Sequence, residues 1–124
     1  MEDHVNLVLQ KINQKYRTDF KNYTIWPDSE QEPTRHEWIV EWTCSDYIHE
    51  AHLAKEMDAL LQQVNADYEA KRANDILLQS PIIHFVPEGT FHDWMKVHNK
   101  LGGQAKIPKL SSDRTVLDEL LISK

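Results

Sequence analysis

The chain has little cysteine, glycine or proline and no long apolar run. Its one cysteine, Cys44, cannot form a disulfide within the chain, and three glycines and five prolines are too few for a collagen-like or low-complexity protein. The first residues, Met-Glu-Asp-His, lack the basic and apolar regions of a secretion signal. No stretch approaches the roughly 18 apolar residues that a membrane-spanning helix needs. We therefore expect a soluble protein of the reducing cytoplasm.

Basic residues are also fewer than acidic ones. Fourteen Lys and Arg against 20 Asp and Glu give a formal net charge of -6, which opposes non-specific binding to nucleic acid or to an anionic membrane. Hydrophobic residues make up 40% of the chain and charged residues 27%, as in ordinary globular proteins. With 124 residues, we expect residues 1–124 to form a single domain around one core.

Several familiar sites are missing. The chain contains no G-x-G-x-x-G and no Walker-type phosphate loop. Of the seven histidines, only His49 and His52 share a helical spacing typical of metal ligands, and no second cluster accompanies them, so we predict no metal site. Cys44 has no neighbouring histidine in the sequence and is interpreted as an incidental or buried thiol.

Apolar residues recur at helical spacing in most of the chain. The first predicted helix would bury a face formed by Val5, Leu9, Ile12 and Tyr16, widened by Val8. The second predicted helix would bury Ile48, Ala51, Ala54 or the stem of Lys55, Met57, Leu60, Leu61 and Val64. The segment from Asn65 to Tyr68 would weaken or bend it. Thr90 is expected to cap the fourth helical segment, and Ser111 or Ser112 the last one. The first four predicted helices cover residues 3–17, 46–64, 69–78 and 91–99, and the last would bury Val116, Leu117, Leu120 and Leu121.

Three segments favour strands. Residues 36–43 (HEWIVEWT) alternate most clearly, with Trp38, Val40 and Trp42 on one face and Glu37, Ile39 and Glu41 on the other. Residues 23–27 should pair with them as an antiparallel hairpin, and residues 82–86 would add a short third strand after Pro81. We predict an α+β fold with a small three-stranded, mainly antiparallel sheet. Its order would be αββαβα plus a C-terminal helix, an incomplete ferredoxin-like arrangement with helices mostly on one face.

The stretch KLGGQAKIPKLSSDR contains what we call the basic arm, residues 100–111. Gly102 and Gly103 free the backbone, Pro108 prevents a helix, and Lys106 and Lys109 flank Ile107 and Pro108. Local physics permits two interpretations. The segment is either a simple linker before the last helix or a mobile arm whose ammonium groups reach an anion outside this domain.

Three motifs in order, NADYEAKRAND (65–75), VPEGTFHDWM (86–95) and the arm sequence, resemble the C-terminal domain of the Gretchen Hagen family of auxin-responsive acyl-acid amido synthetases, in its bacterial branch. The resemblance spans nearly the whole chain. It implies a parent ligase of the adenylate-forming superfamily, which joins a carboxylic acid to ATP with Mg²⁺ and passes the acyl group to an amino acid. This chain alone would be inert and would bind no cofactor.

By the same resemblance, Lys106 matches the family's mobile catalytic lysine, with Gly102 and Gly103 as its hinge. Gln104 and Lys109 would contact substrate or nucleotide, and Asn65 and Tyr68 would contact the arm or another domain. Lys109 stands where the family usually has arginine, so it keeps the charge but lacks the bidentate fork.

The resemblance makes the N-terminal adenylation domain of the same polypeptide the expected partner. The alternative is a freestanding α+β interaction module without catalysis, whose arm docks an acidic partner. A reading frame continuing upstream of Met1 would favour the ligase domain, and a stop codon just before it would favour the module. The acyl acid and the amine would be chosen mainly by the larger domain.

Overall fold

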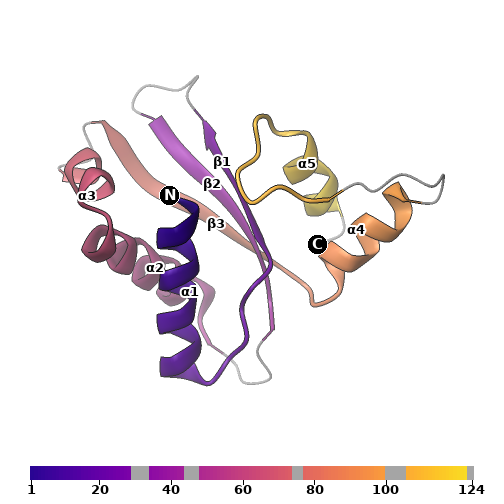
Figure 1. The fold of residues 1–124 in the computed structure, drawn as a ribbon, viewed down its shortest axis with the longest axis horizontal. Helices are drawn as coiled ribbons and strands as arrows, with labels where there is room; N and C mark the ends of the chain where they lie inside the picture. Colours follow the sequence, from indigo (N-terminus) through magenta and orange to yellow (C-terminus); the bar gives the residue numbers. More distant parts are fainter. Residues whose placement is uncertain (29–33, 44–47, 74–76, 100–105, 123–124) are drawn as a thin grey trace.

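The computed structural model describes residues 1–28, 34–43, 48–73, 77–99 and 106–122. These residues form five helices and a three-stranded sheet, so the predicted α+β class is confirmed (Figure 1). In chain order the elements are α1 (Glu2–Tyr16), β1 (Tyr23–Asp28), β2 (Thr34–Glu41), α2 (Glu50–Val64), α3 (Ala66–Arg72), β3 (Leu78–Val86), α4 (Thr90–His98) and α5 (Thr115–Ile122).

The strands lie in the order β1-β2-β3. The predicted hairpin is confirmed, because β1 runs antiparallel to β2 with Tyr23 opposite Val40. The third strand requires a correction, because β3 pairs with β2 in parallel, with Ile83 opposite Trp38. The sheet is therefore mixed and not mainly antiparallel. The reason is the connection through α2 and α3, which returns the chain to the end of the sheet where β2 began.

The strand β3 begins earlier than predicted. The helical segment that was expected to continue to Leu78 ends at Arg72, and Leu78 already belongs to the strand. Pro81 lies inside β3, where Gln79 pairs with Arg35 but Ile82 pairs with Glu37, so the register is irregular at the proline. An edge strand with a bulge tolerates a residue that cannot donate a backbone hydrogen bond. Pro81 thus interrupts the ladder without ending the strand.

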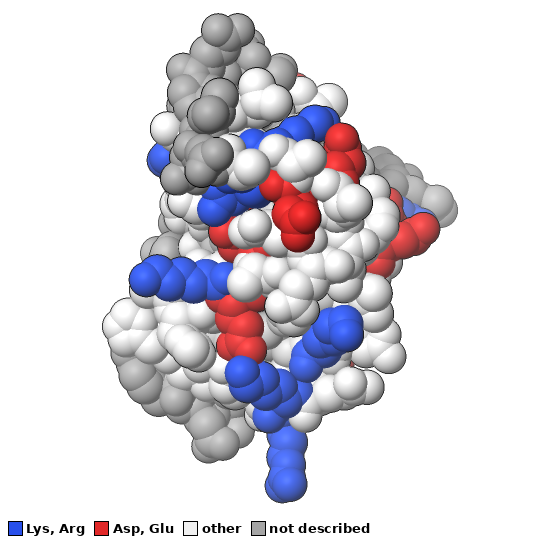
Figure 2. All heavy atoms as spheres, turned by 90° about the vertical axis from the view of Figure 1, so that its left-hand side faces the viewer, with Lys and Arg blue, Asp and Glu red and all other residues white. Residues whose placement is uncertain are grey.

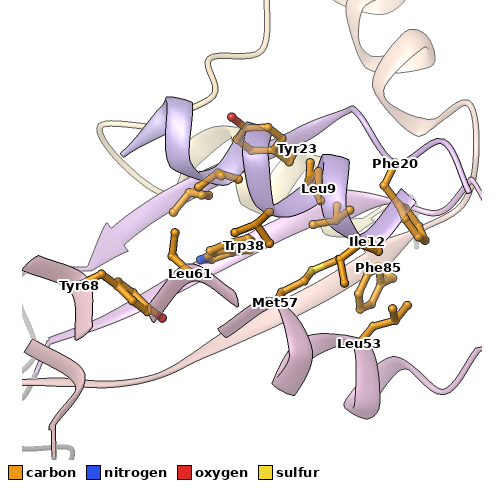
Figure 3. Close-up of a cluster of buried hydrophobic side chains, with 14 of the residues drawn as sticks. Leu9, Ile12, Phe20, Tyr23, Trp38, Leu53, Met57, Leu61, Tyr68 and Phe85 are labelled. Carbon is orange, nitrogen blue, oxygen red and sulfur yellow. The ribbon is translucent and has the colours of Figure 1, made fainter. Parts of the chain in front are cut away.

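One face of the sheet packs on α1 and α2 (Figures 1 and 3). Trp38 is fully buried at the centre of this face, and Tyr68 of α3 closes one end. The prediction for α1 is confirmed, but that for α2 missed Leu53, which is fully buried, and included Ala51, which is exposed. Besides Tyr68 of α3, the buried helix residues of this core are Val5, Val8, Leu9, Ile12, Leu53, Met57 and Leu61.

The opposite face of the sheet carries a second, smaller core formed with α4 and α5. Ile39 of β2 and Val86 of β3 pack there against Phe91, Leu117 and Leu120. The expectation that the helices lie mostly on one face is therefore wrong. The alternation of β2 explains the result, because Ile39 is as fully buried as Trp38 although the two side chains point to opposite faces.

The outer surface of α1, α2 and α3 carries charges of both signs (Figure 2). Lys15 binds Glu56 at 2.6 Å between α1 and α2, and Lys71 lies 3.1 Å from Asp67 within α3. Exposed pairs of this kind stabilise a fold only weakly. In the part of the chain that the structure describes, no helix is long and apolar enough to cross a membrane.

Candidate functional site around Lys106

The described end of the basic arm runs beside the outer edge of β1. The backbone N–H of Ile25 donates to the carbonyl oxygen of Lys109 at 2.9 Å, and the N–H of Ser111 donates to the carbonyl oxygen of Ile25 at 2.7 Å. The two hydrogen bonds form an isolated parallel bridge between Ile25 and Leu110. Residues 109–111 thus extend the sheet by a short fourth segment, as an edge strand readily permits.

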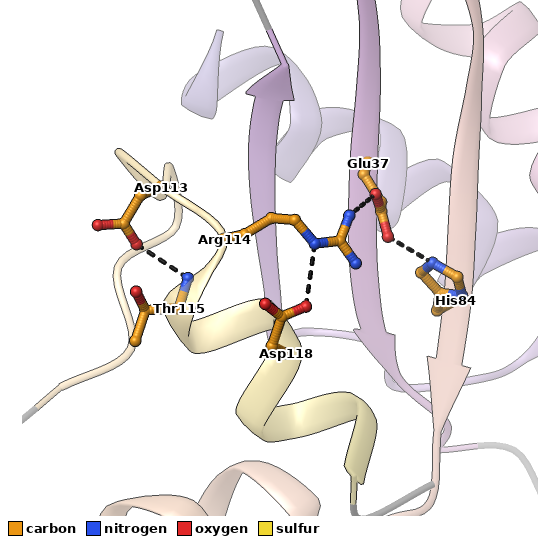
Figure 4. A network of polar contacts seen from close by, with 6 residues as sticks. All are labelled: Glu37, His84, Asp113, Arg114, Thr115 and Asp118. Carbon is orange, nitrogen blue, oxygen red and sulfur yellow. Dashed lines mark hydrogen bonds and ion pairs between the residues drawn. The ribbon is translucent and has the colours of Figure 1, made fainter. Parts of the chain in front are cut away.

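A side chain strengthens this attachment. Thr24 is fully buried, and its hydroxyl donates to the carbonyl oxygen of Pro108 at 2.6 Å. The same oxygen lies 2.6 Å from the Ser111 hydroxyl oxygen. Ser111, predicted as a possible helix cap, therefore binds the sheet instead. At the start of α5 it is the carboxylate of Asp113 that accepts a hydrogen bond of 2.9 Å from the backbone N–H of Thr115 (Figure 4).

Lys106 is exposed just before this attached segment. It lines a depression of about 230 Å³ together with Lys109, and Ile107 between them packs against the second core. Two lysines therefore line one small surface hollow, and Lys109 also lines a second hollow beside α1. The residues that line the first hollow are Asn22, Tyr23, Phe91, Met95, Lys106, Ile107 and Lys109. With two cations and no carboxylate among them, this set suits an anion better than a metal ion.

Lys109 is held against Tyr23. Its ammonium nitrogen lies 4.4 Å from the centre of the Tyr23 ring, a cation–π contact. The ring is fixed in turn, because the Tyr23 hydroxyl donates to the Asn6 side chain at 2.7 Å. Burial, with smaller effects from nearby acidic groups, raises the pKa of Tyr23 to about 12, so this phenol remains a hydrogen-bond donor at neutral pH. The tyrosine fixes the ammonium of Lys109 beside the hollow.

The remaining predicted residues are not all near Lys106. Gly102, Gly103 and Gln104 lie outside the described residues. Asn65 and Tyr68 line a different pocket, of about 750 Å³, which also includes Leu110 of the arm. Asn65 caps α3, because its side-chain oxygen accepts from the Tyr68 backbone N–H at 3.0 Å.

The hydroxyl of Tyr68 points into the protein. It donates to Asp58 at 2.6 Å, and burial together with this bond raises the pKa of Tyr68. Its packing and hydrogen bonding give Tyr68 a structural role, which joins α3 to α2. The contact of Asn65 and Tyr68 with the arm or with another domain stays a prediction.

Comparison with known proteins decides the family. Residues 3–115 match the family model described as the GH3 family C-terminal domain, which covers most of the chain and includes the basic arm. The chain belongs to the GH3 family. The resemblance carried by the three motifs is thereby confirmed for the family and for the C-terminal domain. The bacterial branch and the adenylate-forming superfamily stay predictions.

Solved structures resemble this GH3 domain in fold. A GH3.15 acyl acid amido synthetase superposes with a TM-score of 0.74 at 19% sequence identity, over 98% of this chain and 22% of that one. A structure described as AtGH3.15 acyl acid amido synthetase in complex with 2,4-DB has a TM-score of 0.65 at 20% identity, with the same coverage. The domain spans less than a quarter of the length of both. No curated protein sequence matches the chain.

An ionic network near the arm in the GH3 domain was missed by sequence reasoning (Figure 4). Arg114 donates to Glu37 of β2 and, at 2.9 Å, to Asp118 of α5, and hydrogen bonding to Glu37 raises the pKa of Arg114. His84 of β3 lies 2.8 Å from the other oxygen of Glu37. The network fastens the start of α5 to the sheet. The alternation in HEWIVEWT had placed Glu37 beside Ile39 on one face, and a buried glutamate there required a cationic partner.

The sequence also gave no indication of Thr24, which anchors the arm. A threonine in a β-strand is ordinary, and its partners lie 84 and 87 residues away in the chain. Among the described residues, no group of three or more His, Cys, Asp and Glu side chains could hold a metal ion.

Proposed function

We propose that this chain is the C-terminal domain of an ATP-dependent acyl-acid amido synthetase and that it supplies Lys106 to an active site in the N-terminal domain. The parent would adenylate a carboxylic acid and then transfer the acyl group to an amino acid, and is proposed to belong to the adenylate-forming superfamily and its bacterial branch. The observation that supports the role of Lys106 most directly is its position. Lys106 is exposed and lines a hollow together with Lys109, next to a segment tied to β1.

The first half-reaction needs such a cation. The carboxylate that attacks and the α-phosphate of ATP are both anions and repel each other as they approach. An ammonium between them reduces this repulsion and stabilises the charge that develops on the phosphoryl oxygens. In this proposal the N-terminal domain holds ATP, Mg²⁺ and the acyl substrate. The domain described here contributes positive charge from outside that site.

The second half-reaction needs room for the amine. A lysine on a separate domain can leave the site after adenylation, because its position depends on how the two domains are arranged. Gly102, Gly103 and Gln104 are proposed to contribute the hinge and a polar contact of this movement. Lys109 is proposed as a second, weaker contact with the anion, since its ammonium is already engaged with the Tyr23 ring.

The test is ATP–pyrophosphate exchange by the full-length protein that carries this domain. The assay would use a panel of carboxylic acids that includes 2,4-DB, the compound named with one structural relative. We expect Lys106→Ala to slow exchange by about a hundredfold or more, a loss similar to that of one oxyanion-stabilising donor. Lys55→Ala is the matched control, because Lys55 is an exposed lysine on α2, across the sheet from the arm.

Two results would oppose the proposal. Exchange at the wild-type rate in Lys106→Ala would remove Lys106 from this role. An equal loss in Lys55→Ala would show that the effect is general and not specific to the arm. A full-length protein that exchanges with none of the acids would favour an interaction module without catalysis.

A further inference from the structure

The position of Lys106 depends on how the arm is attached to the sheet. The backbone bridge at Ile25 uses only main-chain groups, and the same bonds would form with almost any residues there. Thr24 adds a contact that depends on a particular side chain. Its hydroxyl reaches the carbonyl oxygen of Pro108, which is only two residues from Lys106.

The donor in each of these contacts follows from the number of protons that each hydroxyl carries. A threonine hydroxyl has one proton, and the geometry directs it to the carbonyl oxygen of Pro108, which can only accept. The Ser111 hydroxyl, 2.6 Å from the same Thr24 oxygen, must therefore donate to Thr24. The three groups form a chain of two hydrogen bonds from Ser111 through Thr24 to Pro108. Pro108 and Ser111, on either side of Lys109 and Leu110, are thus both hydrogen-bonded to the buried hydroxyl oxygen of Thr24.

We propose that Thr24, assisted by Ser111, is a positioning residue for Lys106 in the adenylation reaction. This inference rests on the function proposed above. Adjacent Cα atoms are about 3.8 Å apart, so the Cα of Lys106 can lie no more than about 7 Å from that of Pro108. Fixing the Pro108 carbonyl therefore restricts where the ammonium can go. A charge-stabilising group restrained in this way loses less entropy when it takes its place in the transition state.

Thr24 is better suited to this role than to holding the fold together. Its two described side-chain hydrogen bonds both go to the arm segment, at Pro108 and at Ser111. The pairing of β1 with β2 relies on backbone groups, and Thr24 is opposite Ile39 in that ladder. Loss of the hydroxyl should loosen the arm while β1 stays paired.

The experiment measures ATP–pyrophosphate exchange by the full-length protein with three substitutions. Thr24→Val keeps the side-chain shape without a hydroxyl and should lower kcat about tenfold with little change in KM for ATP, which is less than the hundredfold that a misplacement of one ångström can cost. Thr24→Ser keeps the hydroxyl and should restore most of the rate. Thr90→Val is the matched control and should leave the rate unchanged.

Thr90 is a close match for Thr24. It is also buried, with 6% of its surface exposed, and its hydroxyl donates to a proline carbonyl, that of Pro87, at the same 2.6 Å. The two substitutions remove the same kind of bond and should lower the melting temperature by similar amounts. Only the bond of Thr24 is made to the arm. If Thr24→Val slows exchange and Thr90→Val does not, a general loss of stability cannot be the cause.

A double-mutant cycle with Lys106→Ala gives the decisive result. If Thr24 acts through Lys106, Thr24→Val should have little effect on exchange once Lys106 is alanine. The inference is overturned if Thr24→Val exchanges at the wild-type rate, if its effect is undiminished in the Lys106→Ala background, or if Thr90→Val is equally slow.

If Thr24→Val does not fold, Ser111→Ala removes only the bond from Ser111 and is expected to show a smaller loss of the same kind. A slow Lys106→Ala with a normal Thr24→Val would overturn this inference alone. A normal Lys106→Ala would overturn the proposed function as well.

Discussion

The carboxylate of Glu41, at the end of β2, accepts a hydrogen bond of 2.9 Å from the backbone N–H of Phe91 in the first turn of α4. The two residues are 50 positions apart in the chain. Glu41 is 5% exposed, and its other oxygen accepts a longer bond of 3.3 Å from Asn22. A carboxylate at the start of a helix binds free N–H groups and interacts favourably with the helix dipole. This contact joins α4, and with it the Phe91 wall of the Lys106 hollow, to the sheet.

We expect Glu41→Ala to lower the free energy of unfolding by about 1–2 kcal/mol, the usual cost of losing a helix-capping group. Glu41→Gln keeps an oxygen that can accept from Phe91 and should cost less. Urea unfolding of the 124-residue chain, followed by tryptophan fluorescence, measures both. Equal losses in the two variants would show that the negative charge, and not the hydrogen bond, is what matters.

The buried pair of Asp58 and Arg72 should contribute more than any exposed pair. Arg72 binds both carboxylate oxygens, with its Nε 3.0 Å from Oδ1 and its Nη2 2.7 Å from Oδ2, and the side chains are only 10% and 12% exposed. Burial alone would raise the pKa of Asp58, but the hydrogen bonds from Arg72 and Tyr68 outweigh it and hold this pKa below its usual value. Asp58→Ala leaves the guanidinium without this carboxylate and should cost about 3–5 kcal/mol.

The control for this prediction lies in the next helix. Asp67 is 77% exposed in a pair with Lys71, so Asp67→Ala should change the free energy of unfolding by no more than about 0.5 kcal/mol. Denaturant unfolding of both variants gives the comparison. A loss in Asp58→Ala as small as that in Asp67→Ala would mean that the desolvation cost of the buried pair cancels its attraction.

His36 should make the fold sensitive to mild acid. Burial, with a smaller contribution from the charge of Lys71, lowers the pKa of His36 below its ordinary value of 6.5. The unfolded chain therefore binds a proton at His36 more readily than the folded one. The associated stability is fully present above about pH 6.5 and is lost as the pH falls from there through the folded-state pKa.

The measurement is the free energy of unfolding from pH 8 to pH 5 for the wild type and for His36→Phe, in which this position no longer titrates. We expect the wild type to lose more stability over this range than the variant does. The other described histidines, including His84 beside Glu37, are present in both proteins, so their effects cancel in the difference. Parallel curves would show that His36 accepts a proton in the folded state without penalty.

Local patterns predicted much of this fold but not its long-range pairings. The helical spacing of Val5, Leu9 and Ile12 and the alternation of Trp38 and Val40 followed from which face each side chain takes, and that is set by its immediate neighbours. The parallel pairing of β3 and the proline inside it could not be predicted in this way. The parallel pairing depends on a crossover whose direction no local pattern specifies. The proline is tolerated because β3 lies at an edge of the sheet with an irregular register.

The candidate site, like the fold, was predictable from the sequence only in part. The sequence by itself determined that a lysine, Lys106, sits in a glycine- and proline-containing segment, and the family motifs around it gave that lysine a proposed role. Only the tertiary structure decided that the segment is attached to β1 through Thr24 and that Lys109 rests on Tyr23. These contacts join residues more than 80 positions apart, and they form only when the sheet leaves β1 at its edge with unpaired backbone groups facing the arm.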